Sequence, residues 1–324
     1  MPCPRKLFRC AALLAALACA GLAGPTLVTE PDQGLAPIYA LLGSAGTSID
    51  LTMYELRDAT VTSLLEQAAA RGVAVRVILD QNNEHDKNQA AYDDLAAKGV
   101  AVHWANPGYA CTHQKTLTVD RATSAVMTLN FTPQYYPTSR DFAVITASAA
   151  DIAAIETTFA ADFTDAPVTP PTGADLVWSP TNAQSSLLDL IGSAGASLQV
   201  ENEEMSDGPV VYALCAAAAR GVDVRVAMTD RGSYSRQFGQ LQDAGVSLAL
   251  YPASAPLYIH AKVVLADYGT GRARVFIGSE NFSRASLTRN RELGLILSDP
   301  AILDPVSATL GADFAGGQPY GSRR

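Results

Sequence analysis

The chain has 324 residues, 48% of them hydrophobic, so it can bury a large core and has room for two domains. Its 23 basic and 32 acidic residues give a net charge of −9. A surface this acidic does not attract nucleic acid or anionic lipid at long range, because such binding depends on clustered Lys and Arg.

The first 23 residues are typical of a signal peptide. A basic start precedes an apolar run from Cys10 to Ala20, which is too short to span a bilayer comfortably. We expect a secreted or periplasmic protein. We expect no lipid on Cys19, because Ala16-Leu17-Ala18 fits the lipoprotein pattern poorly. Loss of the basic residues of this segment, Arg5, Lys6 and Arg9, leaves 20 basic residues against 32 acidic ones, a net charge of −12.

The rest of the chain contains two copies of one unit. Three pairs of segments match: residues 42–50 with 191–199, 68–77 with 217–226, and 98–102 with 244–248. The Pro-rich stretch 166–174 breaks both helix and strand and predicts a linker. We therefore expect one half over residues 24–165 and a second half over residues 175–324.

Helices and strands are predicted to alternate within each unit. In the first unit, residues 61–70 have helical spacing and end at Arg71-Gly72, which is typical of a helix C-terminus. The β-branched run 73–79 predicts a buried strand. This alternation predicts an α/β fold. We expect two duplicated α/β sandwich halves, related by a pseudo-twofold axis, with one shared active site in the cleft between them.

Each half carries the pattern H-x-K-x4-D, formed by His113, Lys115 and Asp120 and by His260, Lys262 and Asp267. The chain has only four His and five Lys against eighteen Arg, which argues against two ordinary half-buried strands that happen to carry these residues. Lys at both places indicates a need for a compact ammonium group. In a strand, residues i and i+2 point to the same face, so each His should project beside its Lys.

Two imidazoles and two ammonium groups in one cleft suit an anionic phosphorus centre. The lysines can neutralise the non-bridging oxygens, while one His attacks and the other protonates the leaving oxygen. Asp120 and Asp267 lie five residues after each Lys, on the other face of the strand. We expect them to fix the following turn rather than to take part in the chemistry.

Polar and acidic residues follow each motif at similar distances. Thr128 and Asn130 in the first half, and Ser279 and Asn281 in the second, are neutral donors suited to phosphate oxygens. Further along lie Asp141 and Glu292, and a carboxylate on the far ring nitrogen would fix the tautomer of each His. A solvated strand end is the alternative for these two acids.

With the motif pair followed by Gly278-Ser279-Glu280-Asn281, the chain resembles the phospholipase D superfamily over nearly all of residues 24–324. The resemblance implies two α/β sandwich halves with one active site and no metal or other cofactor. It implies that one His forms a covalent phosphohistidine while the other acts as general acid and then activates water. By analogy we expect His113 to be the nucleophile, although the near-symmetric sequence does not decide. In the first half the pattern departs, because Met127 and Thr128 stand where the family has Gly and Ser.

Three functions are compatible with this pattern. The first is a secreted phospholipase D that cleaves the head-group side of a glycerophospholipid, working as a monomer in transient contact with a membrane surface. The second is a nonspecific nuclease, which the acidic charge disfavours. The third is a binding protein with a decayed site, which the presence of every catalytic residue type in both halves argues against.

Other residues carry weaker patterns. Aromatic residues are expected near the rim of the cleft, where they could contact lipid head groups or stack on bases: Phe131, Tyr135, Tyr136, Tyr251 and Tyr258. The acidic run Glu201 to Glu204 could contact substrate or form a solvated edge, and the loop from Gln81 to Asn88 is a candidate lid. His85 and His103 have no partner pattern, and without ligand spacing a metal site is not expected.

Overall fold

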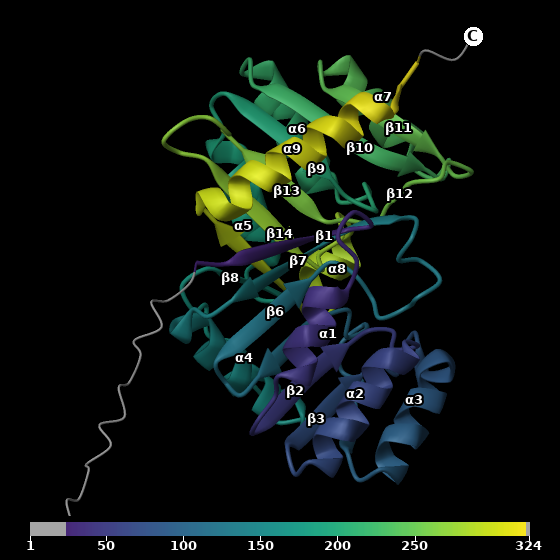
Figure 1. Ribbon diagram of the computed structural model, residues 1–324. Helices are drawn as coiled ribbons and strands as arrows, with labels where there is room; N and C mark the ends of the chain where they lie inside the picture. The colour runs from purple at the N-terminus through teal and green to yellow at the C-terminus, as the bar shows by residue number, and fades with distance from the viewer. Residues whose placement is uncertain (1–23, 322–324) are drawn as a thin grey trace, which may run out of the picture.

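The computed structural model describes residues 24–321, in two mixed α/β halves stacked along one axis (Figure 1). The proposed signal peptide over residues 1–23 lies outside the described residues. Between residues 24 and 321, no helix is long and apolar enough to cross a membrane.

The first sheet has the order β1-β7-β6-β5-β2-β3-β4. Its strands are β1 (Thr26–Glu30), β2 (Ser48–Met53), β3 (Ala74–Leu79), β4 (Ala101–Trp104), β5 (Thr116–Val119), β6 (Thr123–Met127) and β7 (Ser139–Thr146). The helices of this half are α1 (Ala36–Gly43), α2 (Ala59–Ala70), α3 (His85–Ala97) and α4 (Ala149–Asp162).

The second sheet has the order β16-β11-β10-β9-β13-β14-β15-β8. Its strands are β8 (Leu176–Ser179), β9 (Ser197–Glu201), β10 (Asp223–Asp230), β11 (Ser247–Pro252), β13 (Val263–Ala266), β14 (Arg274–Gly278), β15 (Glu292–Leu297) and β16 (Gln318–Pro319). The helices are α5 (Ala183–Ser193), α6 (Gly208–Ala219), α7 (Ser235–Asp243), α8 (Arg284–Thr288) and α9 (Pro300–Gly316). This arrangement confirms the predicted fold class of two duplicated α/β halves.

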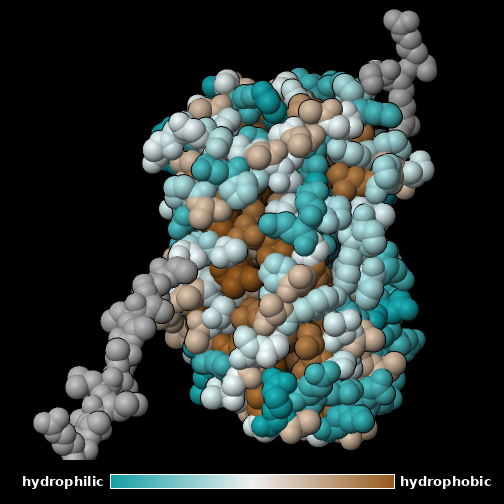
Figure 2. Space-filling model, viewed as in Figure 1, coloured by the Kyte–Doolittle hydropathy of each residue, from teal (hydrophilic) through white to brown (hydrophobic). Residues whose placement is uncertain are grey.

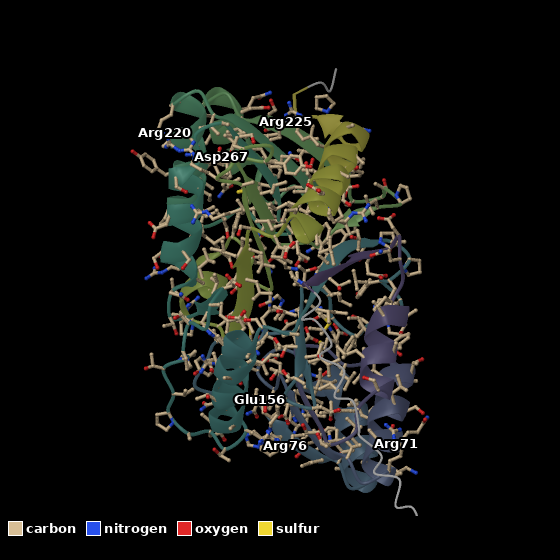
Figure 3. The ribbon with its side chains drawn as sticks, turned by 60° about the vertical axis from the view of Figure 1, so that its left-hand side comes forward. Arg71, Arg76, Glu156, Arg220, Arg225 and Asp267 are labelled. Atoms are coloured by element: carbon tan, nitrogen blue, oxygen red, sulfur yellow. The ribbon has the colours of Figure 1, made fainter. Side chains whose placement is uncertain are left out.

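Equivalent helices of the two halves begin and end with the same chemistry. Asp58 caps α2 and Asp207 caps α6, each accepting hydrogen bonds from backbone N–H groups of the first turn. The Asp58 cap starts α2 at Ala59, two residues before the predicted helix. Both helices end at an Arg-Gly pair, and Arg71 and Arg220 lie toward opposite ends of the molecule (Figure 3). Such placement is expected of a duplicated unit related by a twofold rotation.

The two halves meet through an apolar layer of their own. A large buried cluster lies in each half, and another combines side chains of both, including Val126 and Phe142 of the first half with Leu265, Ile277 and Leu295 of the second. On the face shown in Figure 2 most side chains are hydrophilic, and apolar ones gather at the waist where α9 and β1 meet. Residues 166–172, in the predicted linker, belong to no helix or strand.

Each His-bearing segment leaves its own sheet and pairs with the opposite half. The backbone N–H groups of His113 and Gln114 donate to Arg291 O at 3.0 and 3.1 Å. The short strand β12 (Tyr258–Ile259) adds to the first sheet, parallel to β7. Strands β5 and β13 therefore begin at Thr116 and Val263, after the motif lysines. The expectation that each His and Lys lies within a strand was wrong, because tertiary pairing between the halves competes with the local strand.

Asp120 and Asp267 close a different turn from the one expected. Asp120 Oδ1 accepts from the backbone N–H groups of Thr47 and Ser48 at 2.7 and 2.9 Å, at the entry to β2. Asp267 Oδ1 accepts from Ala196 and Ser197 in the same way at the entry to β9. These aspartates fix the turn that precedes a neighbouring strand, about 70 residues earlier in the chain, rather than the turn that follows each motif.

Replacement of Asp120 by Asn should lower stability without damaging the site. The N–H donors of Ser48, Gly46 and Thr47 lower the pKa of Asp120 to about 2, and losing the charged acceptor should cost about 1–3 kcal/mol of unfolding free energy. Because the folded pKa is depressed, this contribution is complete above about pH 4 and is lost as pH falls toward about 2. Urea denaturation at pH 7 and pH 3 measures it. Unchanged stability in Asp120→Asn would contradict this assignment.

Candidate active site

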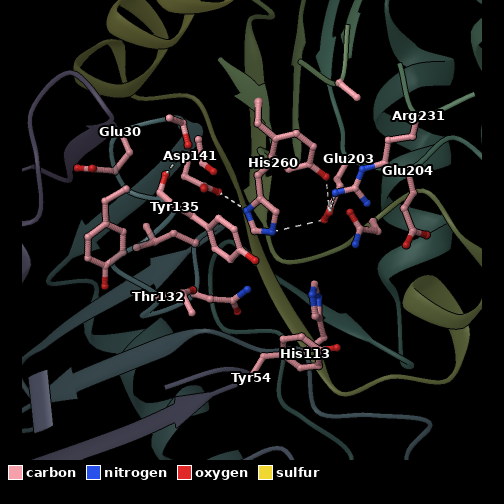
Figure 4. Close-up of a pocket in the computed structure, with 18 of the residues that line it drawn as sticks. Glu30, Tyr54, His113, Thr132, Tyr135, Asp141, Glu203, Glu204, Arg231 and His260 are labelled. Carbon is pink, nitrogen blue, oxygen red and sulfur yellow. Dashed lines mark hydrogen bonds and ion pairs between the residues drawn. The ribbon is translucent and has the colours of Figure 1, made fainter. Parts of the chain in front are cut away.

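The two motifs meet at one cavity between the halves, with a volume of about 530 Å³ (Figure 4). His113 and His260 both line its wall, one from each half. The apolar layer between the halves includes Phe142, Ala261 and Leu293, each next in the chain to a residue of the site, so the docking of the halves brings the two imidazoles together. The predicted shared cleft is therefore present in the structure.

Each imidazole is held by a carboxylate of the other half. His113 Nδ1 lies 2.9 Å from Glu292 Oε2 and 3.1 Å from Ser279 O, while His260 Nδ1 lies 2.7 Å from Asp141 Oδ1. Since Nδ1 donates to the carboxylate, Nε2 is the nitrogen left for chemistry in both rings. The sequence predicted that Asp141 and Glu292 orient the histidines, but it did not show that each pair joins one half to the other.

Polar side chains in turn hold the two carboxylates. Glu292 Oε1 accepts from Ser286 Oγ at 2.6 Å and from Asn290 Nδ2 at 2.9 Å. Asp141 Oδ1 accepts from Thr128 Oγ1 at 2.5 Å. Burial alone would raise the pKa of Glu292, but His113 and Lys115 lower it below its usual value. Glu292 therefore stays ionised beside His113.

The site is electrostatically prepared for an anion. Burial, followed by the neighbouring Lys115, lowers the pKa of His113 to about 4. Burial, followed by Lys262, lowers the pKa of Lys115 to about 7. Both lysines are fully buried, and each donates to the backbone carbonyl of its own motif His. An anion placed among these groups would relieve the repulsion between the two ammonium groups.

The four residues predicted to bind phosphate fall into two classes. Asn130 and Asn281 line the cavity, and the buried Oδ1 atom of each has no hydrogen-bond partner within residues 24–321. Thr128 and Ser279 do not line it, contrary to expectation. Thr128 Oγ1 is used by Asp141, and Ser279 Oγ accepts from Leu293 N at 3.2 Å. These hydroxyls lie behind the histidines, where they support the carboxylate-bearing strands.

Glu203 is a site residue to which the sequence assigned no specific partner. Its Oε2 lies 3.4 Å from His260 Nε2 and 3.2 Å from Lys262 Nζ, and its Oε1 accepts from Tyr258 Oη at 2.7 Å (Figure 4). Glu204 also lines the cavity, whereas Glu201 is completely buried. The acidic run therefore combines two residues at the cavity with one buried residue.

Of the aromatic residues and the lid predicted from the sequence, only some residues lie at the cavity. Tyr135, Tyr136 and Tyr258 line the cavity, but Phe131 is buried in the first half's core, and the buried Tyr251 donates to Asp313 O. No residue of the proposed lid, Gln81 to Asn88, lines the cavity, because α3 begins at His85 and Asn88 binds buried backbone groups.

The other two histidines and the two cysteines of the described residues lie outside the cavity. His85 stacks on Trp104, His103 lies 3.2 Å from an oxygen of Asp165, and Cys111 and Cys215 are free thiols. Within residues 24–321, no cluster of three or more His, Cys, Asp or Glu could hold a metal ion.

Comparisons with known proteins match both halves. A family model described as "Cardiolipin synthase, PLD-like domain" matches residues 38–163 and again residues 187–314. A phospholipase D of Rickettsia bellii is 30% identical over 128 residues, which cover 39% of this chain and 60% of that protein. A cardiolipin synthase A of Pseudomonas aeruginosa is 33% identical over 116 residues, 34% of this chain and 22% of that protein.

Two solved structures share the fold over most of the chain. The phosphatidylserine synthase of Haemophilus influenzae superposes with a TM-score of 0.70 at 11% identity, covering 91% of this chain and 87% of that one. The polyphosphate kinase of Porphyromonas gingivalis gives a TM-score of 0.69 at 18% identity, covering 89% of this chain and 50% of that one. At these identities the likeness concerns the fold alone.

The protonation of His113 can be measured directly in protein labelled with ¹⁵N-histidine. The ring should remain neutral, with the proton on Nδ1, down to about pH 4. In denaturant the same ring should have a pKa of about 6.5. The signal can be assigned by its loss in His113→Asn, because the chain has only four histidines. A native midpoint near that of the denatured chain would contradict the buried electrostatics described here.

Proposed function

The chain belongs to the family of PLD-like domains, present twice in one polypeptide, and from this premise we propose that it is a phosphodiesterase of the phospholipase D type. Its substrate would be the head-group phosphodiester of a glycerophospholipid. The observation that carries the proposal is the pair of imidazoles in one cavity, each with Nδ1 on a carboxylate of the other half.

His113 is the proposed nucleophile. Its depressed pKa leaves Nε2 neutral, with a free lone pair, at neutral pH. Nε2 attacks phosphorus, a P–N bond forms, and the P–O bond to the leaving alcohol breaks. Glu292 stabilises the positive charge that develops on the ring, as the acid of a catalytic triad does. The product of this step is a phosphohistidine and a free alcohol.

His260 is the proposed general acid, and then the general base. Its Nε2 proton passes to the leaving oxygen, and the neutral ring next removes a proton from water. The resulting hydroxide attacks phosphorus, the P–N bond breaks, and His113 returns to its neutral state. Lys115, Lys262, Asn130 and Asn281 would hold the phosphoryl oxygens through both steps. The positive charge and the proton carrier both come from side chains, so the proposed steps use no metal or other cofactor.

The surroundings of the cavity favour lipid over nucleic acid. Its lining contains Glu30, Glu203 and Glu204 but a single arginine, Arg231, so it offers no basic track for a polyanion. Tyr135 lies on the cavity wall and is 50% exposed, which suits transient contact with lipid head groups. The relatives named phospholipase D and cardiolipin synthase A support a phospholipid substrate. We propose that the protein works as a secreted or periplasmic monomer.

Phosphatidyl transfer is the second candidate reaction. The matched family model and one relative carry the name cardiolipin synthase, and an alcohol can resolve a phosphohistidine as water does. Glycerol or ethanol added to the hydrolysis assay would divert the product from phosphatidic acid to a phosphatidyl alcohol if the cavity accepts the alcohol as well as water.

A paired substrate assay tests the proposed function. Protein without residues 1–23, in excess EDTA, is incubated with mixed phospholipid vesicles in one reaction and with single-stranded DNA in another. We expect phosphatidic acid and intact DNA. DNA cleavage with untouched vesicles would place the protein among the nucleases of the superfamily, and loss of lipid hydrolysis in EDTA would overturn the metal-independent mechanism.

Either motif histidine should be essential on its own. His113→Ala and His260→Ala should each lower turnover by about 10³-fold or more, because the nucleophile and the acid act as a unit. The melting temperature of each variant controls for folding. If one single variant keeps most of its activity, the two halves do not share a site.

A further inference from the structure

We infer that Glu203 is a positioning residue that assigns the two histidines their different roles, holding His260 as the proton donor while the corresponding Tyr54 leaves His113 free to attack. This inference rests on the proposed function and identifies a residue outside the duplicated motif. The two halves are nearly symmetric but differ at this position.

Strand register shows that Tyr54 and Glu203 are equivalent positions. In the first half, Thr52 of β2 pairs with Thr116, the residue after Lys115. In the second half, Glu201 of β9 pairs with Val263, the residue after Lys262. Counting two residues onward from each pair leads to Tyr54 and Glu203. A neutral ring in one half therefore corresponds to a carboxylate in the other.

Tyr54 gives His113 an uncharged neighbour. The two rings lie 4.5 Å apart between centroids, in an edge-to-face arrangement at 72°. The same tyrosine ring lies 4.8 Å from Lys115 Nζ. Tyr54 thus contacts both motif residues of its half without offering an acceptor of negative charge to His113 Nε2.

Glu203 gives His260 a second carboxylate. With Asp141 at 2.7 Å from Nδ1 and Glu203 at 3.4 Å from Nε2, both ring nitrogens face negative oxygens. Only the doubly protonated ring has a hydrogen for each of them. Burial would raise the pKa of Glu203, but Lys262, His260 and a hydrogen bond from Tyr258 hold it well below its usual value.

Other charged groups also lie around His260. The other titratable and charged groups at the cavity around His260 are Lys262 and Tyr258 on its own segment, His113 and Glu30 from the first half, and Glu204 and Arg231 beside Glu203. Lys262 and Arg231 both contact Glu203, at 3.2 and 3.6 Å, and these contacts fix its carboxylate in place. His260 is therefore the ring placed to carry a proton, and it releases that proton from Nε2 to the leaving oxygen while Glu203 stays ionised.

The same position makes Glu203 a competitor of the substrate. Its Oε2 contacts Lys262 Nζ and His260 Nε2, the two groups that a phosphoryl oxygen would use. The substrate anion must share or displace these contacts. Removing the charge should therefore strengthen anion binding while weakening proton donation, a combination that a purely structural role would not produce.

Glu203→Gln tests the inference with the side-chain shape retained. We expect the basic limb of the kcat profile to move to lower pH by about one unit, kcat at pH 8.5 to fall about tenfold, and KM to fall or stay unchanged. Glu66→Gln, which removes a carboxylate on α2 outside the cavity, should leave the position of the limb unchanged. An unmoved limb in Glu203→Gln would overturn the inference.

The exchange variant Tyr54→Glu/Glu203→Tyr tests the assignment of roles. Acid quenching followed by peptide mass spectrometry should locate the phosphoryl group on His113 in the wild type and at least partly on His260 in the exchange variant. Phosphorylation of His260 in the wild type would contradict the inference.

A readout independent of turnover separates this inference from the proposed function. In ¹⁵N-histidine spectra, the ring of His260 should lose its proton at lower pH in Glu203→Gln than in the wild type. If the wild type shows no phosphodiester cleavage but this difference is present, the substrate proposal fails and the role of Glu203 stands. If the two proteins titrate alike, the role of Glu203 fails whatever the activity.

Discussion

The site depends on the exchange of short backbone segments between the two halves. The backbone N–H groups of His113 and Gln114 donate to Arg291 O of the second half, and the pairing of β12 with β7 joins the segment before His260 to the first half. Arg291 is itself held by Asp162 of the first half at 3.0 Å. Because of these exchanges, each imidazole finds its carboxylate across the junction. Neither half alone supplies both a motif histidine and the carboxylate at its Nδ1.

The junction between the halves also buries charged side chains, which is energetically unfavourable unless a ligand or a partner neutralises them. Two ammonium groups, two imidazoles and several carboxylates lie at or below the cavity wall, and Lys115 and Lys262 have no exposed surface. Lone buried charges cost several kcal/mol, so crossed pairs and backbone carbonyls must satisfy them. The remaining positive charge on Lys115 is what a bound phosphate would neutralise. The arrangement therefore lowers the stability of the ligand-free protein and raises its affinity for an anion.

Much of this was predictable from the sequence, because a duplication and a rare residue pair leave signals at fixed spacing. The two halves, the H-x-K pairs, and the carboxylates Asp141 and Glu292 were all named from it. The crossed pairing was not, since it arises from how the halves dock and not from any local pattern. Thr128 and Ser279 were misplaced because a hydroxyl near a motif does not reveal which side of the strand it supports. The match between the two units already sets Glu203 opposite Tyr54, but its specific role became visible only from its contacts with His260 and Lys262.

The crossing of the histidine–carboxylate pairs can be tested by low-field proton NMR of the Nδ1–H groups. Glu292→Gln should remove or shift the signal of His113 and leave that of His260 in place, whereas Asp141→Asn should do the reverse. That pattern would show that each half depends on the other for a working imidazole. If Asp141→Asn instead affected His113, and Glu292→Gln affected His260, the pairs would lie within each half and the account of a shared site would be wrong.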